Sequence, residues 1–379
     1  MRNNYIMYGI LLFYLFFNTF FLVPAGLNFY NLLNFLIWLS IFGLSVFLSK
    51  DVNLRIKGEK DKTQSLLIAL IIYIILYFLS GLIFGFERTP YSKTIINIIK
   101  NVFMFGSVVI FQEFARESLI KNNKKSVINY VFMTILFALL DINISNAFSQ
   151  FGDVQSGFTY ISTIVIPAFV SSAVLTYLVY INGAKASIMY RLFMLIPPFI
   201  VPIIPNYDWF ATAIVGITVP LGVYVYMNYI HVNKTEKLSK RERKNYSPTV
   251  YLPVFVFIAL LAGFVIGVFK YQPIAVLSGS MSPTFNRGDA VIIEKLNTRE
   301  KNELKKGDII QFVSGTKYVV HRINDITNDE YGNKLFITKG DHNNAIDYDK
   351  VHLENVKGKV AAIVPFIGYP SVWLSGAIS

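Results

Sequence analysis

The sequence predicts an α-helical polytopic membrane domain of about nine spans, followed by a small β-rich extracytoplasmic domain. Hydrophobic residues make up 54% of the 379 residues and charged residues only 15%, unlike a soluble domain. Apolar runs of roughly twenty residues, the length that crosses a bilayer core, recur from Tyr5 to Phe269. From Tyr271 onward, short β-branched runs separated by glycine, asparagine and aspartate replace them.

The apolar runs predict the membrane spans. They cover 5–22, 29–48, 66–85, 95–113, 127–142, 160–181, 188–204, 209–231 and 251–270. Lys100 interrupts the fourth run, which could instead be an amphipathic helix at the membrane interface. The seventh contains Pro197, Pro198 and Pro202, so we expect it to be kinked or partly re-entrant. The first run is longer than the apolar core of a usual signal peptide, and we expect it to be a retained helix.

The distribution of basic residues predicts the orientation. The alternate loops that would lie inside the cell hold 18 Lys and Arg residues, whereas the opposing loops hold only Arg88 and Lys93. Because positive loops stay in the cytoplasm, we expect a multi-pass protein of the cell membrane with a cytoplasmic N-terminus and residues 271–379 outside. That outer part holds 13 basic and 12 acidic residues. Its near-neutral charge argues against a nucleic-acid groove.

The composition predicts four segments. They are a multispan membrane domain (1–232), a basic cytoplasmic loop (233–250), an anchoring transmembrane helix (251–270) and an extracytoplasmic β-rich domain (271–379). The chain has no cysteine, which excludes disulfides and thiolate metal sites. Asp141, at the outer end of the fifth span, is expected to reach the outer interface.

Six short runs predict strands in the β-rich domain. They are Ile274–Ser278, Ala290–Lys295, Asp308–Val313, Tyr318–Ile323, Leu335–Thr338 and Lys359–Val364. The stretch Val360–Ser379 carries no charge and is interrupted by prolines and glycines. We expect a closing strand and then an apolar surface bearing Trp373 at the lipid interface, with a tenth span as the alternative.

One serine stands out in the run V-L-S-G-S-M-S-P-T-F at 276–285. Ser280 follows a glycine that allows close backbone approach, and a proline stiffens the exit. A serine can attack a carbonyl only if a base takes its proton. His321, in the strand-like run 318–323, is the best candidate base, and Asp341 and Asp347 follow it.

Ser278-Gly279-Ser280-Met281-Ser282-Pro283-Thr284 resembles the nucleophile box of type I signal peptidases. The other boxes of the family follow in order: Gly307-Asp308, His321-Arg322, Gly340-Asp341 with Asn343, and Asp347. A histidine in place of the common bacterial lysine is similar to the subtype of archaea, the endoplasmic reticulum and some spore-forming bacteria. The resemblance covers roughly residues 251–370.

The resemblance implies a membrane-bound serine endopeptidase that works without a cofactor or metal. Its β-rich catalytic domain on the outer face would cut signal peptides from exported precursors after small residues. The implied partners are those precursors and the lipid bilayer, with the secretion channel as a further candidate. The additional N-terminal spans lie outside the resemblance.

Each candidate residue has a role that chemistry can state. Ser280 would be the nucleophile and His321 its general base. Asp347 would hold the other ring nitrogen of the imidazole, and Asp341 would brace its loop. The Ser280 backbone N–H, with the Ser278 hydroxyl proposed from the resemblance, would stabilise the oxyanion.

Other assignments stay open at this point. Lys317 shares the predicted strand face of His321 and is the alternative base, provided that it is desolvated. Asp349 competes with Asp347 for the imidazole. His342 and His352 lie near carboxylates, but their spacing fits no standard zinc site.

Two further hypotheses concern the outer domain as a whole. Met281, Phe285 and the apolar tail are expected to lean on lipid beside the outer leaflet. The alternative function is a multispan transport or scaffold protein whose outer domain is a non-catalytic binding module.

Overall fold

The computed structural model describes residues 2–24, 26, 30–48, 58–122, 127–152, 154–235, 247–315, 317–330 and 332–374. Most of the predicted basic loop, residues 236–246, lies outside the described residues. The chain divides into two compact units, Met1–Val256 and Phe257–Ser379, and the boundary falls inside helix α13 (Leu252–Ile266).

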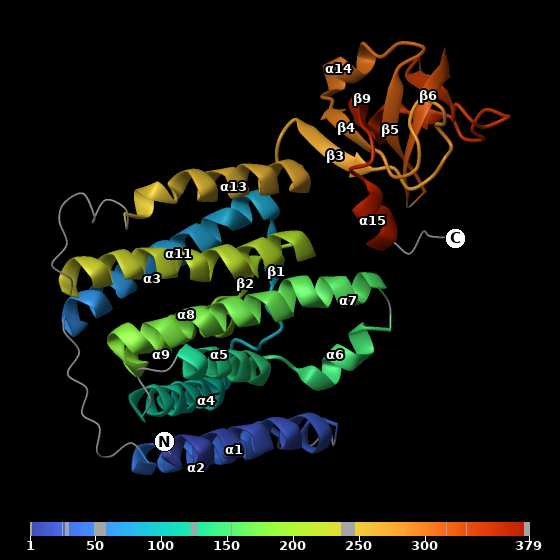
Figure 1. Ribbon diagram of the computed structural model, residues 1–379. Coiled ribbons are helices and arrows are strands. Elements are labelled where there is room, and N and C mark those ends of the chain that lie inside the picture. Colours follow the sequence, from blue (N-terminus) through green and yellow to red (C-terminus); the bar gives the residue numbers. More distant parts are fainter. Residues whose placement is uncertain are drawn as a thin grey trace. The chain divides into compact units, whose positions relative to one another are not determined.

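Helices build the first unit (Figure 1). They are α1 (Arg2–Phe17), α2 (Tyr30–Leu48), α3 (Glu59–Phe84), α4 (Ile95–Asn122), α5 (Val127–Asp141), α6 (Ile144–Gln150), α7 (Val154–Tyr160), α8 (Ile166–Asn182), α9 (Ala184–Leu195), α10 (Pro197–Ile200) and α11 (Trp209–Thr235). The π-helical segment η1 (Asn18–Leu22) extends α1, and η2 (Ile161–Val165) joins α7 to α8.

Among the described residues, six helical segments are long and apolar enough to cross a membrane. The pair α5 and α6, bent by 71°, would make a seventh, and α13 is apolar but shorter. The fourth predicted span is one continuous helix, α4, despite Lys100. The number nine stays a prediction.

The predicted span 188–204 is broken in the structure. Helix α9 ends at Leu195, immediately before the Pro197-Pro198 pair that begins the short α10. Strand β2 (Ile203–Pro205) follows and pairs antiparallel with β1 (Phe86–Arg88). Prolines lack the N–H groups that a continuous helix needs, so the break follows from the sequence.

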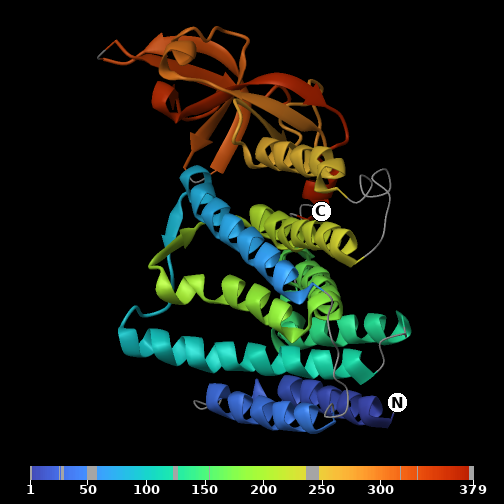
Figure 2. The ribbon, with the colours of Figure 1, turned by 90° about the vertical axis from the view of Figure 1, so that its left-hand side faces the viewer.

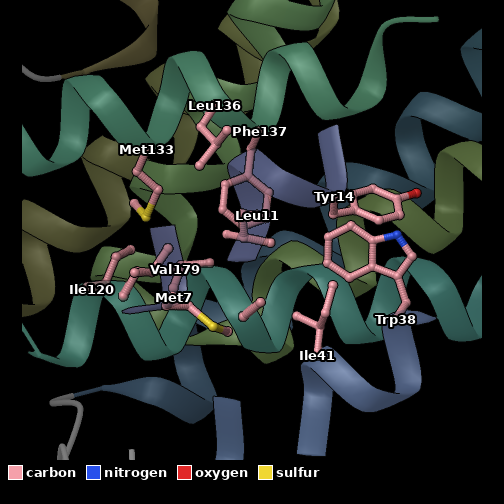
Figure 3. Packing of buried hydrophobic residues seen from close by; sticks show 12 residues of the cluster. Met7, Leu11, Tyr14, Trp38, Ile41, Ile120, Met133, Leu136, Phe137 and Val179 are labelled. Atoms are coloured by element: carbon pink, nitrogen blue, oxygen red, sulfur yellow. The ribbon is translucent and has the colours of Figure 1, made fainter. Parts of the chain in front are cut away.

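Two apolar cores hold the helical unit together. The first lies between α1, α2, α4 and α5, where the Tyr14 ring meets the Trp38 ring edge-on and Phe137 lies beside Leu11 (Figure 3). The second lies between α3, α8, α9 and α11. Helix α8 serves both, through Val179 in the first core and neighbouring residues in the second. In lipid such cores are stabilised by close packing rather than by exclusion of water.

The outer surface of this unit is apolar. Figure 2 shows α2 beside α4 and α8 beside α11, packings that leave other helix faces uncovered. Large exposed side chains follow one face of α3 over several turns: Ile68, Ile71, Ile72, Ile75, Leu76 and Leu79. A continuous apolar face of this length is not stable against water, so it indicates contact with lipid.

The second unit is a seven-stranded antiparallel sheet. Its strands are β3 (Tyr271–Ala275), β4 (Ala290–Lys295), β5 (Ile309–Ser314), β6 (Lys317–Asn328), β7 (Lys334–Lys339), β8 (Val351–His352) and β9 (Val356–Val364). They lie in the order β3-β4-β9-β5-β6-β7-β8. Register shifts in β4, β5 and β6 bend the sheet, which carries one apolar cluster around Phe312 and Phe336 and another around Val291 and Ile293.

The six predicted strands all occur in the structure. Ala290–Lys295 has the predicted ends, and the other five differ at one end or both. The first begins at Tyr271, three residues before the prediction, because Tyr271 to Ala275 pair with β4. The pattern missed β8, which is only two residues long. The end of the chain forms α15 (Tyr369–Leu374), whose six residues are too few to cross a membrane, and residues 375–379 lie outside the described residues.

The fold predicts a strict requirement for glycine at position 358. A Cβ at Gly358 would collide with the Glu294 carbonyl oxygen on β4 and with the Ile293 side chain. Gly358→Ala should therefore destabilise the β-rich unit by about 2 kcal/mol, measured by thermal unfolding of the full chain in detergent. Gly279→Ala is the control, because its Cβ meets nothing within 4 Å. Equal melting temperatures for the two variants would contradict the packing.

Candidate active site

The loop that carries Ser280 connects β3 to β4 and is anchored by its apolar neighbours. Met281 and Phe285 are 1% and 2% exposed, and both pack against Val291 and Ile293 of the sheet. The expectation that these two side chains contact lipid was therefore wrong. Their burial fixes the loop on either side, which leaves Ser280 only partly covered.

Three predicted residues form a hydrogen-bonded chain. The Oγ atom of Ser280 lies 3.2 Å from Nε2 of His321, and Nδ1 of His321 lies 2.6 Å from Oδ2 of Asp347. His321 projects from β6 on the face of Val319 and Ile323, as strand alternation predicted, and the Phe312 ring lies near its edge. The sheet thus brings together groups that are 41 and 26 residues apart.

The partners of the imidazole determine which nitrogen carries the proton. An ionised carboxylate only accepts hydrogen bonds, so Nδ1 of His321 donates to Asp347. Nε2 is then the acceptor and faces the Ser280 hydroxyl. The Ser278 Oγ atom lies 3.2 Å from the Ser280 Oγ, which leaves the Ser278 hydroxyl to donate to Ser280. The Ser278 hydroxyl thus donates to Ser280, and the Ser280 hydroxyl donates to Nε2 of His321, the nitrogen that can accept a proton.

Thr338 is a contributor that the sequence pattern did not reveal. Its side chain is fully buried at the end of β7, and its hydroxyl donates to Oδ2 of Asp347 at 2.6 Å. The Asp347 N–H also donates to the Thr338 carbonyl at 2.8 Å. These two bonds fix the Asp347 loop to the sheet. A threonine that ends a strand is common, so only the structure could show this contact.

The loop after β7 holds Ser280 from the other side. The N–H of His342 donates to the Ser280 carbonyl at 2.9 Å. A Cβ at Gly340 would come within 2.7 Å of the same carbonyl, so only glycine fits there without moving the nucleophile. This is the kind of close backbone approach for which glycine is needed.

Asp341 precedes His342 in this loop. Among the described residues it makes no hydrogen bond to His321. Arg322 binds it in a bidentate way, Nε to Oδ1 at 2.9 Å and Nη2 to Oδ2 at 2.7 Å, and the Thr284 hydroxyl donates to Oδ2. The hydrogen bond from Arg322, with that from Thr284, lowers the pKa of Asp341 despite partial desolvation. The same bond raises the pKa of Arg322. Asp341 therefore joins the loop after β7 to the nucleophile loop and to β6.

Comparison with known proteins identifies the family. The family described as "Signal peptidase, peptidase S26" matches residues 249–331. Signal peptidase I W of Bacillus subtilis is 38% identical over 123 residues, which are 30% of this chain and 63% of that protein. The SEC11 catalytic subunits of the signal peptidase complexes of Zygosaccharomyces rouxii and Lachancea thermotolerans are 33% and 34% identical, over 28% of this chain and 68% of each protein. The chain belongs to the signal peptidase family.

The family resemblance read from the sequence is thereby confirmed, including the subtype that the endoplasmic-reticulum relatives represent. Members of this family are serine endopeptidases that remove signal peptides. The chain spans just under two thirds of the length of the Bacillus signal peptidase, and the match begins only at residue 249.

The alternative assignments in this signal peptidase domain have less geometric support. Lys317 is exposed at the start of β6, four strand residues from His321, which is about 13 Å. Asp349 makes no hydrogen bond to the imidazole, whose Nδ1 is bound by Asp347. Neither His342 nor His352 belongs to a group of three or more possible metal ligands in the described part of the chain.

The Arg322–Asp341 pair predicts a stability that depends on pH. Because the pKa of Asp341 is lowered in the folded state, its stabilising effect is present above the ordinary carboxyl pKa of about 3.9 and is lost as pH falls through the lowered value. Asp341→Asn should cost about 1–2 kcal/mol at pH 7, from the weakened charged hydrogen bonds. Thermal unfolding of the full chain should show a smaller difference from wild type at pH 3 than at pH 7. A difference of the same size at both pH values would contradict the assignment.

Proposed function

We propose that this chain is a membrane-bound serine endopeptidase that removes signal peptides from exported precursor proteins after small residues. The hydrogen-bonded chain from Ser280 through His321 to Asp347 carries the proposal. A serine hydroxyl does not ionise unaided, and this arrangement supplies the acceptor for its proton at hydrogen-bond distance. The relatives, named as signal peptidases, supply the substrate class.

The reaction follows from the proton positions. Ser280 Oγ attacks the scissile carbonyl while its proton moves to Nε2 of His321. The imidazolium that forms keeps its Nδ1–H bond to Asp347, whose charge stabilises it. His321 then gives the proton to the leaving amine, and water hydrolyses the acyl-enzyme with the same base. The Thr338 hydroxyl keeps the carboxylate in place through both halves of the reaction.

The oxyanion site belongs to the same loop. We assign its donors as the backbone N–H of Ser280 and the hydroxyl of Ser278, which lies 3.2 Å from the nucleophile. When Ser280 Oγ bonds to the substrate, the Ser278 hydroxyl can turn from that atom to the carbonyl oxygen beside it. The backbone N–H of Ser280 needs no such movement, and a donor fixed before the reaction stabilises the developing negative charge most effectively. Asp341 is given a positioning role, because its partners are Arg322 and Thr284.

The division of the chain and its orientation are part of the proposal. We retain nine spans, with the membrane domain at 1–232, the basic loop at 233–250, the anchoring helix at 251–270 and the catalytic domain at 271–379. Three of the 18 basic residues assigned to the cytoplasm, Lys62, Arg116 and Arg191, turn inward in the helical unit. Taking these three from 18 leaves 15 against two, so the charge bias persists.

Two contacts and one strand pairing within the helical unit agree with this arrangement. The Arg191–Asp141 pair does not, because the charge count assigns Arg191 to the cytoplasmic side and Asp141 to the outer end of the fifth span. Lys62 Nζ donates to the Ile181 carbonyl at 3.0 Å, and Lys234 pairs with Asp61 at 2.9 Å. Both contacts join helix ends that the charge bias puts inside the cell. The pairing of β1 with β2 joins two connections that it puts outside. If an odd number of membrane spans lay between two such segments, the segments would be on opposite sides of the membrane and could not pair.

The apolar tail supports a lipid-facing catalytic domain at the cell membrane. Phe366, Ile367 and Trp373 are all more than half exposed. Phe366 also adopts a positive φ of 68°, a conformation that costs energy for a non-glycine residue. Exposed aromatic side chains of this kind are typical of membrane interfaces. The alternative of a non-catalytic scaffold has no feature in its favour comparable with the Ser280–His321–Asp347 chain.

Precursor cleavage tests the proposed chemistry. Ser280→Ala and His321→Ala should each reduce signal-peptide removal from a co-expressed precursor by about 10³-fold or more, because nucleophile or base is lost. Lys317→Ala is the matched control on the same strand and should keep activity near wild type. Cleavage that survives in His321→Ala but not in Lys317→Ala would replace the imidazole with the lysine as base. Cleavage by all three variants would refute the serine mechanism.

Labelling of single cysteines tests the orientation, since the natural chain has none. Arg299→Cys lies on an exposed helix of the catalytic domain, where the arginine side chain is 92% exposed. A membrane-impermeant maleimide added to intact cells should label this cysteine. Lys60→Cys, exposed at the start of α3, should react only after the cells are lysed. Labelling of the second and not the first would place the catalytic domain in the cytosol.

A further inference from the structure

The helical unit contains four charged residues that the proposed peptidase chemistry does not use. Arg116 Nε lies 3.0 Å from Glu113 Oε2 on α4, Arg191 Nη1 of α9 lies 3.0 Å from Glu113 Oε1, and Arg191 Nη2 lies 2.7 Å from Asp141 Oδ1 at the end of α5. We call these four residues the buried ion quartet. Two carboxylates and two guanidiniums give it no net charge. Asp141 pairs with Arg191, and its expected place at the outer interface stays a prediction.

One half of the quartet is closed. The Glu113 and Arg116 side chains are fully buried, and Arg116 also donates to the Ser172 carbonyl and hydroxyl and to the Thr176 hydroxyl. Its guanidinium lies 4.1 Å from the centre of the Phe137 ring. These contacts join α4, α5 and α8. The role of this half is structural.

The other half faces a cavity. The Arg191 and Asp141 side chains are 15% and 25% exposed, and both line a cavity of about 400 Å³. Most of the remaining wall is apolar and comes from α4, α8, α9 and α11, including Leu175, Met194 and Val219. The cavity therefore has one charged corner in a mostly apolar wall, to which Tyr73, Ser171 and Tyr190 add hydroxyl groups. This is the usual form of a ligand site.

A second hollow lies next to this cavity, on the side of the exposed apolar face of α3. An apolar groove of about 450 Å³ shares Tyr73 and Val219 with the cavity and is also lined by Ile68, Ile72 and Leu76. These three side chains belong to the exposed apolar face of α3. A ligand dissolved in the bilayer could thus enter along the groove, with its apolar chain still in contact with lipid.

The polar corner specifies the chemistry of the ligand. Three of the five guanidinium donors of Arg191 are used, by Gln112, Glu113 and Asp141, and Oδ2 of Asp141 has no partner among the described residues. A donor and an acceptor remain side by side. A hydroxyl group matches both, because it can accept from Arg191 and donate to Asp141. The neutrality of the quartet disfavours a charged head group in this apolar setting.

The shape excludes a polypeptide. A helix is about 10–12 Å across with its side chains and needs more room than this cavity has. An extended peptide would bring several N–H and carbonyl groups into a mostly apolar cavity, at a cost of several kcal/mol for each group left unpaired. A single apolar chain with one polar end avoids both problems.

We propose that the cavity between α4, α8, α9 and α11 binds an uncharged lipid alcohol, with its hydroxyl on the Arg191–Asp141 pair and its chain along the groove at Val219. This site is separate from the proposed peptidase activity. It belongs to the part of the chain that precedes the family match.

Photolabelling of the full chain in phosphatidylcholine nanodiscs tests the site. The probe is hexadecanol with a diazirine in its chain. It should label α8 or α11, unlabelled hexadecanol should compete at least fivefold better than palmitate at pH 8, and Val219→Phe should reduce labelling at least fivefold. Leu221→Phe is the matched control, because Leu221 is exposed on the same helix and lines neither hollow. Equal labelling of the two variants would overturn the proposal.

Two further variants make the outcome decisive. Gly222→Leu fills the groove at a position where a Cβ meets nothing within 4 Å, so reduced labelling should follow even if Val219→Phe misfolds. Asp141→Asn gives the quartet one net positive charge, and the preference should then shift from hexadecanol towards palmitate. An unchanged preference, or displacement of the probe only by an apolar helical peptide, would refute a lipid-alcohol site.

Discussion

The hydrogen bond between Nδ1 of His321 and Asp347 is the constraint on which the proposed site depends. It selects the tautomer whose Nε2 can receive a proton, and it fixes the plane of the ring that faces Ser280. The bond exists because β6 and β7 are neighbours in the sheet, which puts Thr338 and the loop of Asp347 beside His321. The arrangement of the strands is thus part of the proposed catalytic geometry. The apolar cluster around Phe312 and Phe336, which includes Ile323 of β6, holds these strands together.

Much of this site could be predicted from the sequence because its residues occur in a fixed order within recognisable turns and strands. Ser280, His321 and Asp347 were assigned from the resemblance to the boxes of type I signal peptidases, and the structure brings their side chains together. The supporting contacts could not be predicted. Thr338 is an ordinary strand residue, and the box that contains Arg322 does not show that its partner is Asp341. A single sequence carries no record of such long-range pairs.

The errors have physical causes too. Met281 and Phe285 were assigned to lipid because apolar residues near a membrane helix suggest it, but loop residues follow no period that would reveal their buried side. The pairing of Asp141 with Arg191 was not foreseen, because the two residues lie 50 positions apart in the sequence. The break at Pro197, in contrast, was foreseeable, because proline removes a helical hydrogen bond wherever it occurs.

The buried ion quartet also constrains how the protein is made. Glu113 and Arg116 neutralise each other within one turn of α4, so this helix can leave the ribosome and enter the translocon with its charges already compensated. Asp141 has no such neighbour in its own helix, and its ion pair can form only when α9, with Arg191, has been synthesised. Stable insertion of α5 is therefore coupled to the appearance of a helix about 50 residues later. Truncated chains that stop before α9 would expose a lone carboxylate to lipid and become substrates for membrane quality control.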